Sequence, residues 1–259
     1  MIASRFCGVA LAMLFLVGVE LSAQPPVLGA SAYAPIPPVP GLSGGGTAAT
    51  EYPDVKSLLM PTRNMRIRQM DPFYAACAAA EYHLNTGRLY KINLSPDYLN
   101  LRLLTNNPDV GSILELLQHE GTVSAGVVPY GTPRLTRQSE STEHYRINGY
   151  VTLFPPGASP AQRADRIREA LRNGHPVIAT FNVRRNFLEL PARETHYRPE
   201  QGNTEAAETH TLLVTHYHPG EGTFELMNSW GSSWGERGCV RVDHRDFADM
   251  VAGAWVVVP

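Results

Sequence analysis

The spacing of apolar residues changes along the chain, from a helical pattern in its first half to strand-like runs in its second. Residues 72–85, 112–119 and 160–173 have the composition or apolar spacing of helices. Apolar and β-branched runs then predict strands at residues 176–183, 211–217, 223–227, 239–242 and 254–258. Helices followed by strands predict an α+β fold with a helical half and a β-rich half.

The helix over residues 72–85 has the clearest start and stop signals. Asp71 is a favoured N-cap residue, and Pro72 suits the first helical position because the N–H that it lacks would have no helical partner there. An alanine-rich stretch follows, and Asn85-Thr86-Gly87 ends the helix. The other two helices also have boundary signals, since Gly121 follows one and Ser159 precedes the other.

The first 50 residues differ in composition from the rest of the chain. Arg5 precedes an almost wholly apolar run at residues 9–19, so residues 1–23 are predicted to be a signal peptide. That run is too short to span a bilayer, and an uncleaved anchor is the alternative. Residues 24–50 are rich in proline and glycine, which predicts a flexible, partly polyproline spacer. Residues 51–259 are then predicted to form the globular domain.

Charge and export limit the classes of partner. The formal net charge is −2 over 259 residues, which gives no sign of a nucleic-acid or anionic-membrane partner. The signal peptide predicts a secreted or periplasmic protein with no membrane span after cleavage. We expect no cofactor.

The most specific pattern lies near the C-terminus. His210 opens an apolar strand, and the chain later reads Asn228-Ser229-Trp230-Gly231 and then Ser233-Trp234-Gly235-Glu236. This pattern resembles the histidine and asparagine half of the papain family of cysteine peptidases. Stretches that support the resemblance are Met60-Pro61-Thr62-Arg63, Val128-Pro129-Tyr130, residues 145–150 and residues 175–178.

The resemblance implies a papain-like fold, in which a helical L-domain packs against a β-rich R-domain with a cleft between them. A peptide or protein ligand would bind in that cleft. The resemblance also implies that His210 faces the nucleophile position across the cleft, that Asn228 orients His210, and that Trp230 shields the hydrogen bond between them.

The other half of the family's catalytic pattern is replaced. The family's nucleophilic cysteine opens the central helix, and that position falls on Asp71, between Arg63 upstream and the alanine-rich helix downstream. Met65 stands where the family has the glutamine that lends an amide to the oxyanion hole. Gln69-Met70 stands where the family has Gly-Ser, and these bulkier residues are expected to narrow the cleft floor.

These replacements remove several catalytic parts together. Peptide cleavage of this type needs a thiolate, whereas a carboxylate is a poor nucleophile toward an amide. The thioether of Met65 cannot donate the oxyanion hydrogen bond, a loss typically worth ~10²–10³ in rate. The sequence therefore predicts a catalytically inactive homologue, or pseudopeptidase, that acts by binding peptide or protein. One alternative is an active peptidase or amidase that uses Cys77 or a non-standard Asp71/His210 site. Another is a structural or regulatory module attached through the spacer.

The two remaining cysteines are expected to be structural. Cys77 lies six residues into the predicted helix among alanines, where a thiol would be buried and unreactive. Cys77 and Cys239 would either pair as a disulfide or remain two buried thiols, and the sequence is compatible with both.

Other candidate residues have simpler explanations. His216 and His218 could face one side of a strand, but without a third ligand they predict a solvated strand end rather than a metal site. Glu205 and Glu208 are expected on a solvated loop, and would favour basic ligands if they line the cleft. Trp234, like Trp230, is expected to pack in the core or at its rim.

Overall fold

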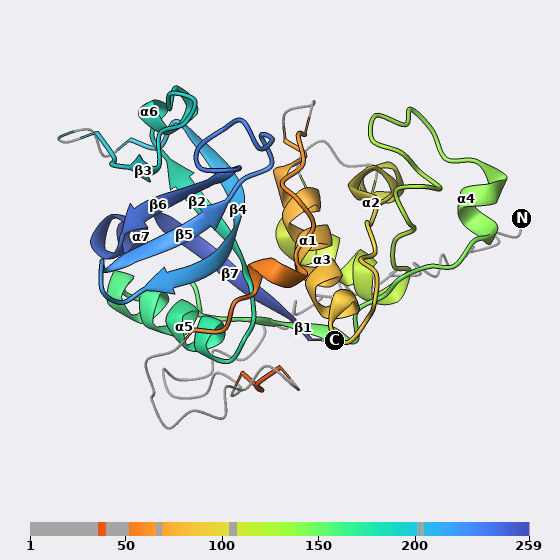
Figure 1. Ribbon diagram of the computed structural model, residues 1–259, viewed down its shortest axis with the longest axis horizontal. Helices are drawn as coiled ribbons and strands as arrows, with labels where there is room; N and C mark the ends of the chain where they lie inside the picture. The colour runs from red at the N-terminus through yellow and green to blue at the C-terminus, as the bar shows by residue number, and fades with distance from the viewer. Residues whose placement is uncertain are drawn as a thin grey trace, which may run out of the picture. The chain divides into compact units, whose positions relative to one another are not determined.

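The computed structural model describes residues 36–39, 52–65, 69–103, 108–200, 202 and 205–258 (Figure 1). Within these residues, seven strands form one sheet in the order β1-β7-β2-β4-β5-β6-β3. The strands are β1 (Gly149–Thr152), β2 (Val177–Val183), β3 (His196–Tyr197), β4 (Glu208–His218), β5 (Thr223–Met227), β6 (Cys239–Asp243) and β7 (Val251–Val258). Neighbouring strands are antiparallel except for β3 and β6, which are parallel.

Helices cover both faces of this sheet. All the helices of the described residues are η1 (Lys56–Leu58), α1 (Asp71–Asn85), α2 (Pro96–Leu103), α3 (Val110–His119), α4 (Arg137–Ser141), α5 (Pro160–Arg172), α6 (Arg185–Leu188) and α7 (His244–Met250). In Figure 1, α1 and α3 lie on one side of the sheet and α5 and α7 on the other. The predicted α+β class, with a helical half followed by a β-rich half, is confirmed.

The central strands separate two apolar cores. Ile178, Leu213 and Val257 pack into the core that contains α1 and α3, whereas the residue before each of them packs into the core that contains α5 and α7. Successive side chains of a strand point to opposite faces, so a strand that is buried on both faces must be apolar at nearly every position. This explains why the sequence shows continuous apolar runs here instead of an alternating pattern.

The helix starts follow from local hydrogen bonds. Asp109 caps α3 by accepting a hydrogen bond from the Ser112 amide at 3.0 Å. At α5, the Ser159 hydroxyl oxygen accepts from the Gln162 amide at 3.3 Å, and the Gln162 side chain accepts from the Ser159 amide at 2.9 Å. This reciprocal pair satisfies two amides that the helix itself leaves without partners.

The three predicted helices and five predicted strands are all present, with shifted ends. β4 begins at Glu208 and β7 at Val251, three residues before each predicted start. Shorter elements were not predicted, namely η1, α2, α4, α6, α7, β1 and β3. Several of these span one or two turns or a few residues, too few for a period to be recognised.

The prediction that Asp71 is the N-cap of α1 is wrong by one residue. The N-cap is Met70, which makes no side-chain capping hydrogen bond, and Asp71 is the first residue of the helix. The Asp71 carboxylate instead accepts a hydrogen bond from the Thr211 amide, on a different element. A tertiary contact has therefore replaced the local one that the sequence favoured.

Residues 36–39 differ from the flexible spacer that the composition predicted. Ile36 and Val39 are 3% and 2% exposed, and each packs into one of the two apolar cores. Proline-rich sequence lowers the entropy lost on ordering, so a short segment can dock where two apolar side chains find pockets. The predicted signal peptide, residues 1–23, and the rest of the predicted spacer lie outside the described residues.

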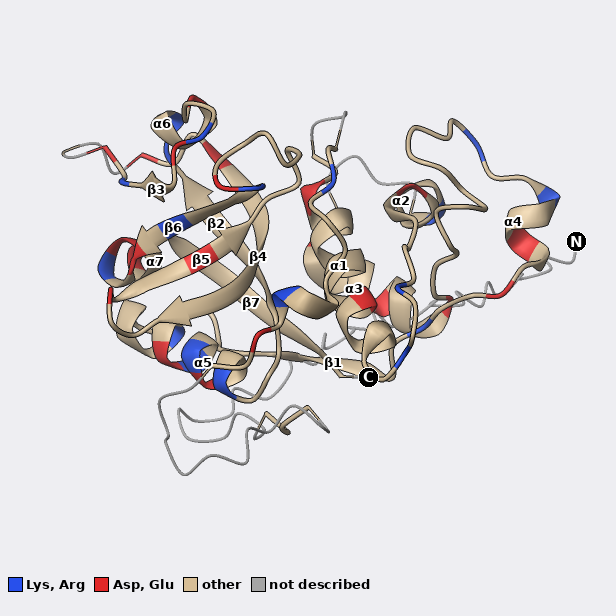
Figure 2. Cartoon of the chain, in the orientation of Figure 1, with Lys and Arg blue, Asp and Glu red and all other residues tan. Residues whose placement is uncertain are grey.

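Charged residues are mixed in sign over the surface elements. Figure 2 shows Lys and Arg interspersed with Asp and Glu on α5 and on the loops, while the strands are mostly uncharged. Among the described residues, no helix is both long and apolar enough to cross a membrane.

Candidate functional site

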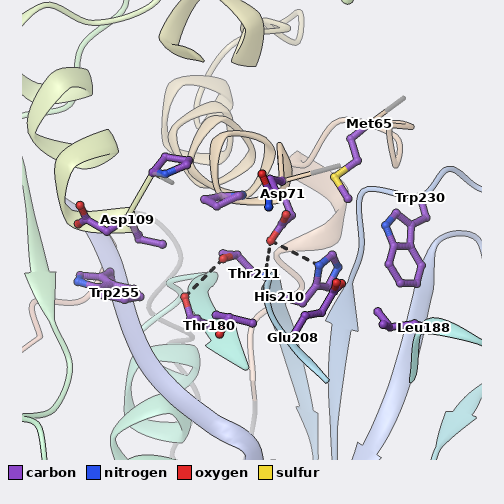
Figure 3. Close-up of a pocket in the computed structure, with 15 residues that line it drawn as sticks. Met65, Asp71, Asp109, Thr180, Leu188, Glu208, His210, Thr211, Trp230 and Trp255 are labelled. Carbon is purple, nitrogen blue, oxygen red and sulfur yellow. Dashed lines mark hydrogen bonds and ion pairs between the residues drawn. The ribbon is translucent and has the colours of Figure 1, made fainter. Parts of the chain in front are cut away.

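The start of α1 meets the start of β4 at a buried acid–histidine contact. Asp71 is 5% exposed, and its carboxylate oxygen Oδ2 lies 3.4 Å from His210 Nδ1. The same oxygen accepts a hydrogen bond from the Thr211 backbone N–H at 2.6 Å, as the dashed lines of Figure 3 show. A carboxylate at the first turn of a helix is further favoured by the positive end of the helix dipole. The Asp71 carboxylate is thus held from three directions.

The opposite side of the His210 ring faces Asn228. His210 Nε2 lies 3.0 Å from Asn228 Oδ1, and that same oxygen accepts a hydrogen bond from the Ser229 amide at 2.7 Å. The second contact fixes which end of the Asn228 amide faces the ring. Two acceptor oxygens therefore face the two ring nitrogens, and an imidazole with a proton on each nitrogen can donate to both.

Aromatic rings shield the His210–Asn228 contact. The Trp230 ring centroid lies 4.9 Å from that of His210. The ring centroid of Phe187, a residue of α6, lies 5.8 Å from that of His210. Trp234 meets Trp230 edge to face at 5.3 Å and is itself buried. Such apolar cover excludes water and strengthens the polar contacts inside it. The structure thus places Trp230 against the ring of His210, and Trp234 packs against Trp230.

A pocket of about 780 Å³ opens beside this contact. Figure 3 shows Asp71 and His210 between Met65 and Trp230 on one side and Thr180 and Trp255 on the other. The described residues that line it are Met65, Gln69, Asp71, Pro72, Pro108, Asp109, Val110, Thr180, Leu188, Glu208, Thr209, His210, Thr211, Trp230 and Trp255. Elements of both halves of the fold contribute, so the pocket lies where the helical part meets the sheet.

The segment that carries Met65 is joined to the loop that follows β5. The Met65 amide donates to the Ser229 carbonyl at 2.7 Å, and the Gly231 amide donates to the Arg63 carbonyl at 2.9 Å. These bonds fix the Met65 backbone at the rim of the pocket. Its side chain is a thioether, which offers no N–H or O–H donor to a bound carbonyl.

A buried ion pair anchors the same segment from behind. The Arg63 guanidinium donates to the Glu81 carboxylate at 2.7 Å and to Asn93 at 3.1 Å. Glu81 is fully buried and also accepts from the Leu94 amide at 2.6 Å. Burial raises the pKa of Glu81, and the positive charge of Arg63 opposes that rise. The pocket rim is therefore tied to the middle of α1.

Gln69 occupies an unusual backbone conformation at the pocket edge. Its φ of +67° lies in the left-handed region, which side chains with a Cβ seldom adopt. The resemblance placed a glycine at this position, and glycine adopts this conformation freely. The size of Gln69 predicts a narrower cleft floor, whereas its left-handed backbone has no signal in the neighbouring residues.

Neither described cysteine reaches the pocket. Cys77 and Cys239 are free and buried, and they are absent from the pocket lining. Burial raises the pKa of the Cys77 thiol well above its usual range, and raises that of Cys239 to about 12. Of the two arrangements that the sequence left open, the structure has two separate buried thiols.

The remaining candidates lie in different places. Glu208 is exposed and lines the pocket, while Glu205 is exposed on the preceding loop. The rings of His216 and His218 are 4.6 Å apart at the far end of β4, and His218 Nε2 lies 3.9 Å from Glu225 Oε2. Across the part of the chain that the structure describes, no three His, Cys, Asp or Glu side chains are grouped to hold a metal ion.

Sequence reasoning missed one whole side of the pocket. Asp109, Thr180 and Trp255 line it from α3, β2 and β7. Asp109 had a local signal as a helix cap, but nothing near Thr180 or Trp255 in the sequence indicates that they meet there. Their meeting depends on the pairing of β2 with β7.

Comparison with known proteins agrees with this geometry. The sequence model of the papain family cysteine protease family matches residues 110–253, more than half of the chain. The chain belongs to the papain family. The matched range includes His210, Asn228 and Trp230, whereas Asp71 and Met65 precede it and are placed by the structure.

Individual relatives are distant. The chain is 26% identical over 128 residues to the uncharacterized peptidase C1-like protein L477 of Acanthamoeba polyphaga mimivirus, over 46% of this chain and 38% of that protein. This member of the papain family thus spans well under half of that relative's length.

Solved structures support the fold. Xylellain, a cysteine protease from Xylella fastidiosa, superposes with a TM-score of 0.67 at 16% identity, over 79% of this chain and 88% of xylellain. The Carica candamarcensis cysteine protease CMS1MS2, solved in complex with E-64, gives a TM-score of 0.60 at 17% identity over 78% of this chain and 94% of that one. The predicted papain-like fold is confirmed.

Proposed function

We propose that this protein is an exported pseudopeptidase of the papain family, which binds a peptide or protein segment in its pocket without cleaving it. One observation carries the proposal. The Asp71 carboxylate occupies the helix start opposite His210, where it accepts the Thr211 amide at 2.6 Å and faces His210 Nδ1 at 3.4 Å.

The chemistry of that contact supports binding rather than hydrolysis. Acyl transfer needs a nucleophile that forms a labile intermediate, and the carboxylate of Asp71 would form a mixed anhydride of higher energy than a thioester. A carboxylate that is paired with an imidazole and a backbone amide is also stabilised as it stands, which lowers its reactivity. The His210–Asp71 pair therefore supports a structural role for the histidine.

The oxyanion position supports the same conclusion. Catalysis in this family type depends on donors aimed at the charge that develops on the carbonyl oxygen, and Met65 offers none from its side chain. The described thiols do not compensate, because Cys77 and Cys239 are buried away from the pocket lining. A nucleophilic role for Cys77 would require the core helix to open.

The shape of the pocket supports a ligand. Its volume of about 780 Å³ lies in the range of ligand pockets, and its lining combines Trp, Leu, Met, Val and Pro side chains with a similar number of polar and charged ones. The structurally similar Carica candamarcensis protease is in complex with E-64, which supports the same cleft as the ligand site in this chain. Export is proposed from the signal-like residues 1–23.

Two measurements test hydrolysis and binding separately. The purified full chain is incubated with a mixture of fluorogenic peptides, with and without a thiol alkylator, and binding of uncleavable peptides is measured by calorimetry. We expect no cleavage and saturable binding. Alkylator-sensitive cleavage that disappears in Cys77→Ala would overturn the proposal, and so would failure of any peptide in a broad library to bind.

Export has its own test. The protein is expressed with residues 1–259 in a bacterial host, and the N-terminus of the soluble product is sequenced. We expect it to begin at Gln24 in a periplasmic or secreted fraction. A product that keeps Met1 in the cytoplasmic fraction would contradict export while leaving the pocket proposal intact.

A further inference from the structure

Residues 36–39 dock on the folded domain at a place of their own. Ile36 and Val39 are buried, whereas Pro37 and Pro38 between them are exposed. Two aliphatic side chains three residues apart are therefore held, and the two prolines face away. None of these residues lines the pocket of Asp71 and His210.

The spacing of the buried residues matches a polyproline II helix. That helix has three residues per turn, so positions 36 and 39 lie on one face. The sequence around them, Pro35-Ile36-Pro37-Pro38-Val39-Pro40, favours this conformation because proline fixes φ and biases the residue before it to extended geometry. The segment loses little entropy when it docks.

The turn between α5 and β2 forms hydrogen bonds with the backbone of this segment. The Asn173 side-chain amide donates to the Ile36 carbonyl at 2.8 Å, and the Asn173 carbonyl accepts from the Val39 amide at 2.9 Å. His175 Nε2 lies 2.6 Å from the Pro37 carbonyl oxygen, so the histidine is the donor. Three hydrogen bonds over four residues is dense for a segment that contains two prolines, which lack an N–H.

The turn is itself a rigid platform. The Tyr82 hydroxyl of α1 donates to the Gly174 carbonyl at 2.5 Å, which ties the turn to the central helix. Ile36 packs into the core of α5 and α7, and Val39 into the core of α1 and α3. The segment therefore spans the line where the two apolar cores meet.

The location separates this site from the pocket. In Figure 1 the red-orange segment lies at the lower end of the domain, whereas α1 begins at the upper end beside the pocket. A ligand in the pocket and a ligand on the turn would not compete for the same residues.

We infer that the turn Asn173–His175, with the two apolar sockets beside it, is a binding site for polyproline II peptides with aliphatic side chains three residues apart. Its resident ligand is residues 36–39 of this same chain. The site clamps the proline-rich leader to the folded domain and fastens its two cores together.

The occupied site is tested first in the full chain, by hydrogen exchange at single amides. The Val39 amide should exchange at least about tenfold more slowly than the amide of an unstructured residue, because it is bonded to Asn173 in a buried setting. In the variant Ile36→Ser/Val39→Ser the protection of the amide at position 39 should be lost. The matched variant Pro38→Ser, which changes an exposed residue, should keep it. Free exchange at Val39 in the unchanged protein would overturn the inference.

The emptied site is tested next with a peptide. The peptide Ala-Pro-Ile-Pro-Pro-Val-Pro-Gly, which copies residues 34–41, is titrated into the full-length Ile36→Ser/Val39→Ser variant. We expect saturable binding up to about 1 mM peptide, and at least tenfold weaker binding to the unchanged protein, whose tethered segment competes at a millimolar effective concentration.

A permuted peptide, Ala-Pro-Pro-Ile-Val-Pro-Pro-Gly, keeps the composition and destroys the three-residue spacing. Equal binding of the two peptides would overturn the inference, as would the absence of binding by the first.

Discussion

The two walls of the pocket differ in how closely they follow the papain-family pattern. The sheet wall presents His210 and Trp230, whose rings are tilted against each other with centroids 4.9 Å apart. Asn228 is buried beside them, with its Oδ1 3.0 Å from His210 Nε2. The helix wall presents Asp71, Met65 and Gln69, which precede the range that the family model matches. In the alignment that we propose, they stand where the family has cysteine, glutamine and glycine. Our proposal is that one wall keeps the residue types of catalysis and that the other replaces them.

The difference indicates that the arrangement of the side chains at this site can be kept while their chemical reactivity changes. Asp71 faces His210 at 3.4 Å. If Asp71 stands at the nucleophile position, as we propose, a carboxylate has kept the contact with the histidine without the reactivity of a thiolate. What preserves the arrangement lies behind the helix wall, in the Arg63–Glu81 pair and the apolar core of α1. The walls can therefore be separated by experiment.

The largest effect is expected behind the helix wall. Glu81→Ala leaves the largely buried Arg63 guanidinium without its carboxylate partner, which should cost about 3–5 kcal/mol of unfolding free energy. Chemical denaturation followed by fluorescence measures this change.

The exposed pair Arg185–Glu189 provides the control, because its charges remain in water. Glu189→Ala should leave the denaturation midpoint unchanged. If Glu81→Ala were tolerated equally well, the helix wall would be held by apolar packing alone, and the ion pair would not explain why the pocket geometry survives.

The next effect tests whether the sheet wall is still competent. If only the helix wall has lost function, Asp71→Cys should produce measurable peptide cleavage, and Asp71→Cys/Met65→Gln should be faster by ~10²–10³, the usual value of one oxyanion donor. Cleavage of a fluorogenic peptide under reducing conditions measures both rates.

The control for this pair is His210→Ala in the double variant, which should abolish the gain. Two inactive variants with an intact fold by circular dichroism would mean that the sheet wall has also lost its competence. The comparison would then fail, because both walls would have diverged.

The contrast between the walls also explains what the sequence could predict. His210 lies on β4, and Asn228 and Trp230 follow β5, the next strand, which pairs with β4. Their meeting therefore follows from a single hairpin, which a local sequence pattern can predict. The helix over 160–173 has a capping box at its start and Gly174 after its end. The helix over 72–85 has a proline in its first turn and Gly87 after its end, so both are marked locally in the sequence.

What the sequence missed depends on contacts between distant segments. Thr180 and Trp255 join the pocket only because β2 pairs with β7, and Asp71 gave up its capping role for an amide on β4. The proline-rich composition of residues 36–39 predicts a spacer because it shows few residues that could form a core. Their order depends instead on apolar sockets that α5, β2 and α1 form together in the folded protein. Tertiary structure overrode local preference in each case.

A smaller loss of stability is expected when the pH is lowered, because two buried histidines lie behind the two walls of the pocket. His83 on α1 and His175 before β2 lie with ring centroids 5.3 Å apart. Burial lowers the pKa of both histidines. The neighbouring His175 lowers the pKa of His83 further, to about 3. A lowered pKa in the folded state means that the unfolded chain takes up protons first as the pH falls. Stability is then full above about pH 6.5 and decreases toward pH 3.

Between pH 7 and 5 the unfolding free energy should fall by about 2 kcal/mol through His83 alone. His83→Phe should flatten the dependence of the unfolding free energy on pH by close to one proton, while His119→Gln, at an exposed residue, should leave it unchanged. A slope that His83→Phe does not alter would show that the walls are not joined through a neutral histidine pair.

The smallest effect concerns the backbone of the helix wall. Gln69 has a φ of +67°, and a left-handed residue with a Cβ costs roughly 1–2 kcal/mol, which glycine avoids at an entropic cost of its own. Gln69→Gly should therefore raise the unfolding free energy by about 0.5–1 kcal/mol, measured by denaturation. Met70→Gly is the matched control, because Met70 has a φ of −92° and a buried side chain, so that substitution should destabilise. If Gln69→Gly also destabilised the protein, contacts of the glutamine side chain at the pocket would outweigh the strain, and the residue would be part of the binding surface of this wall.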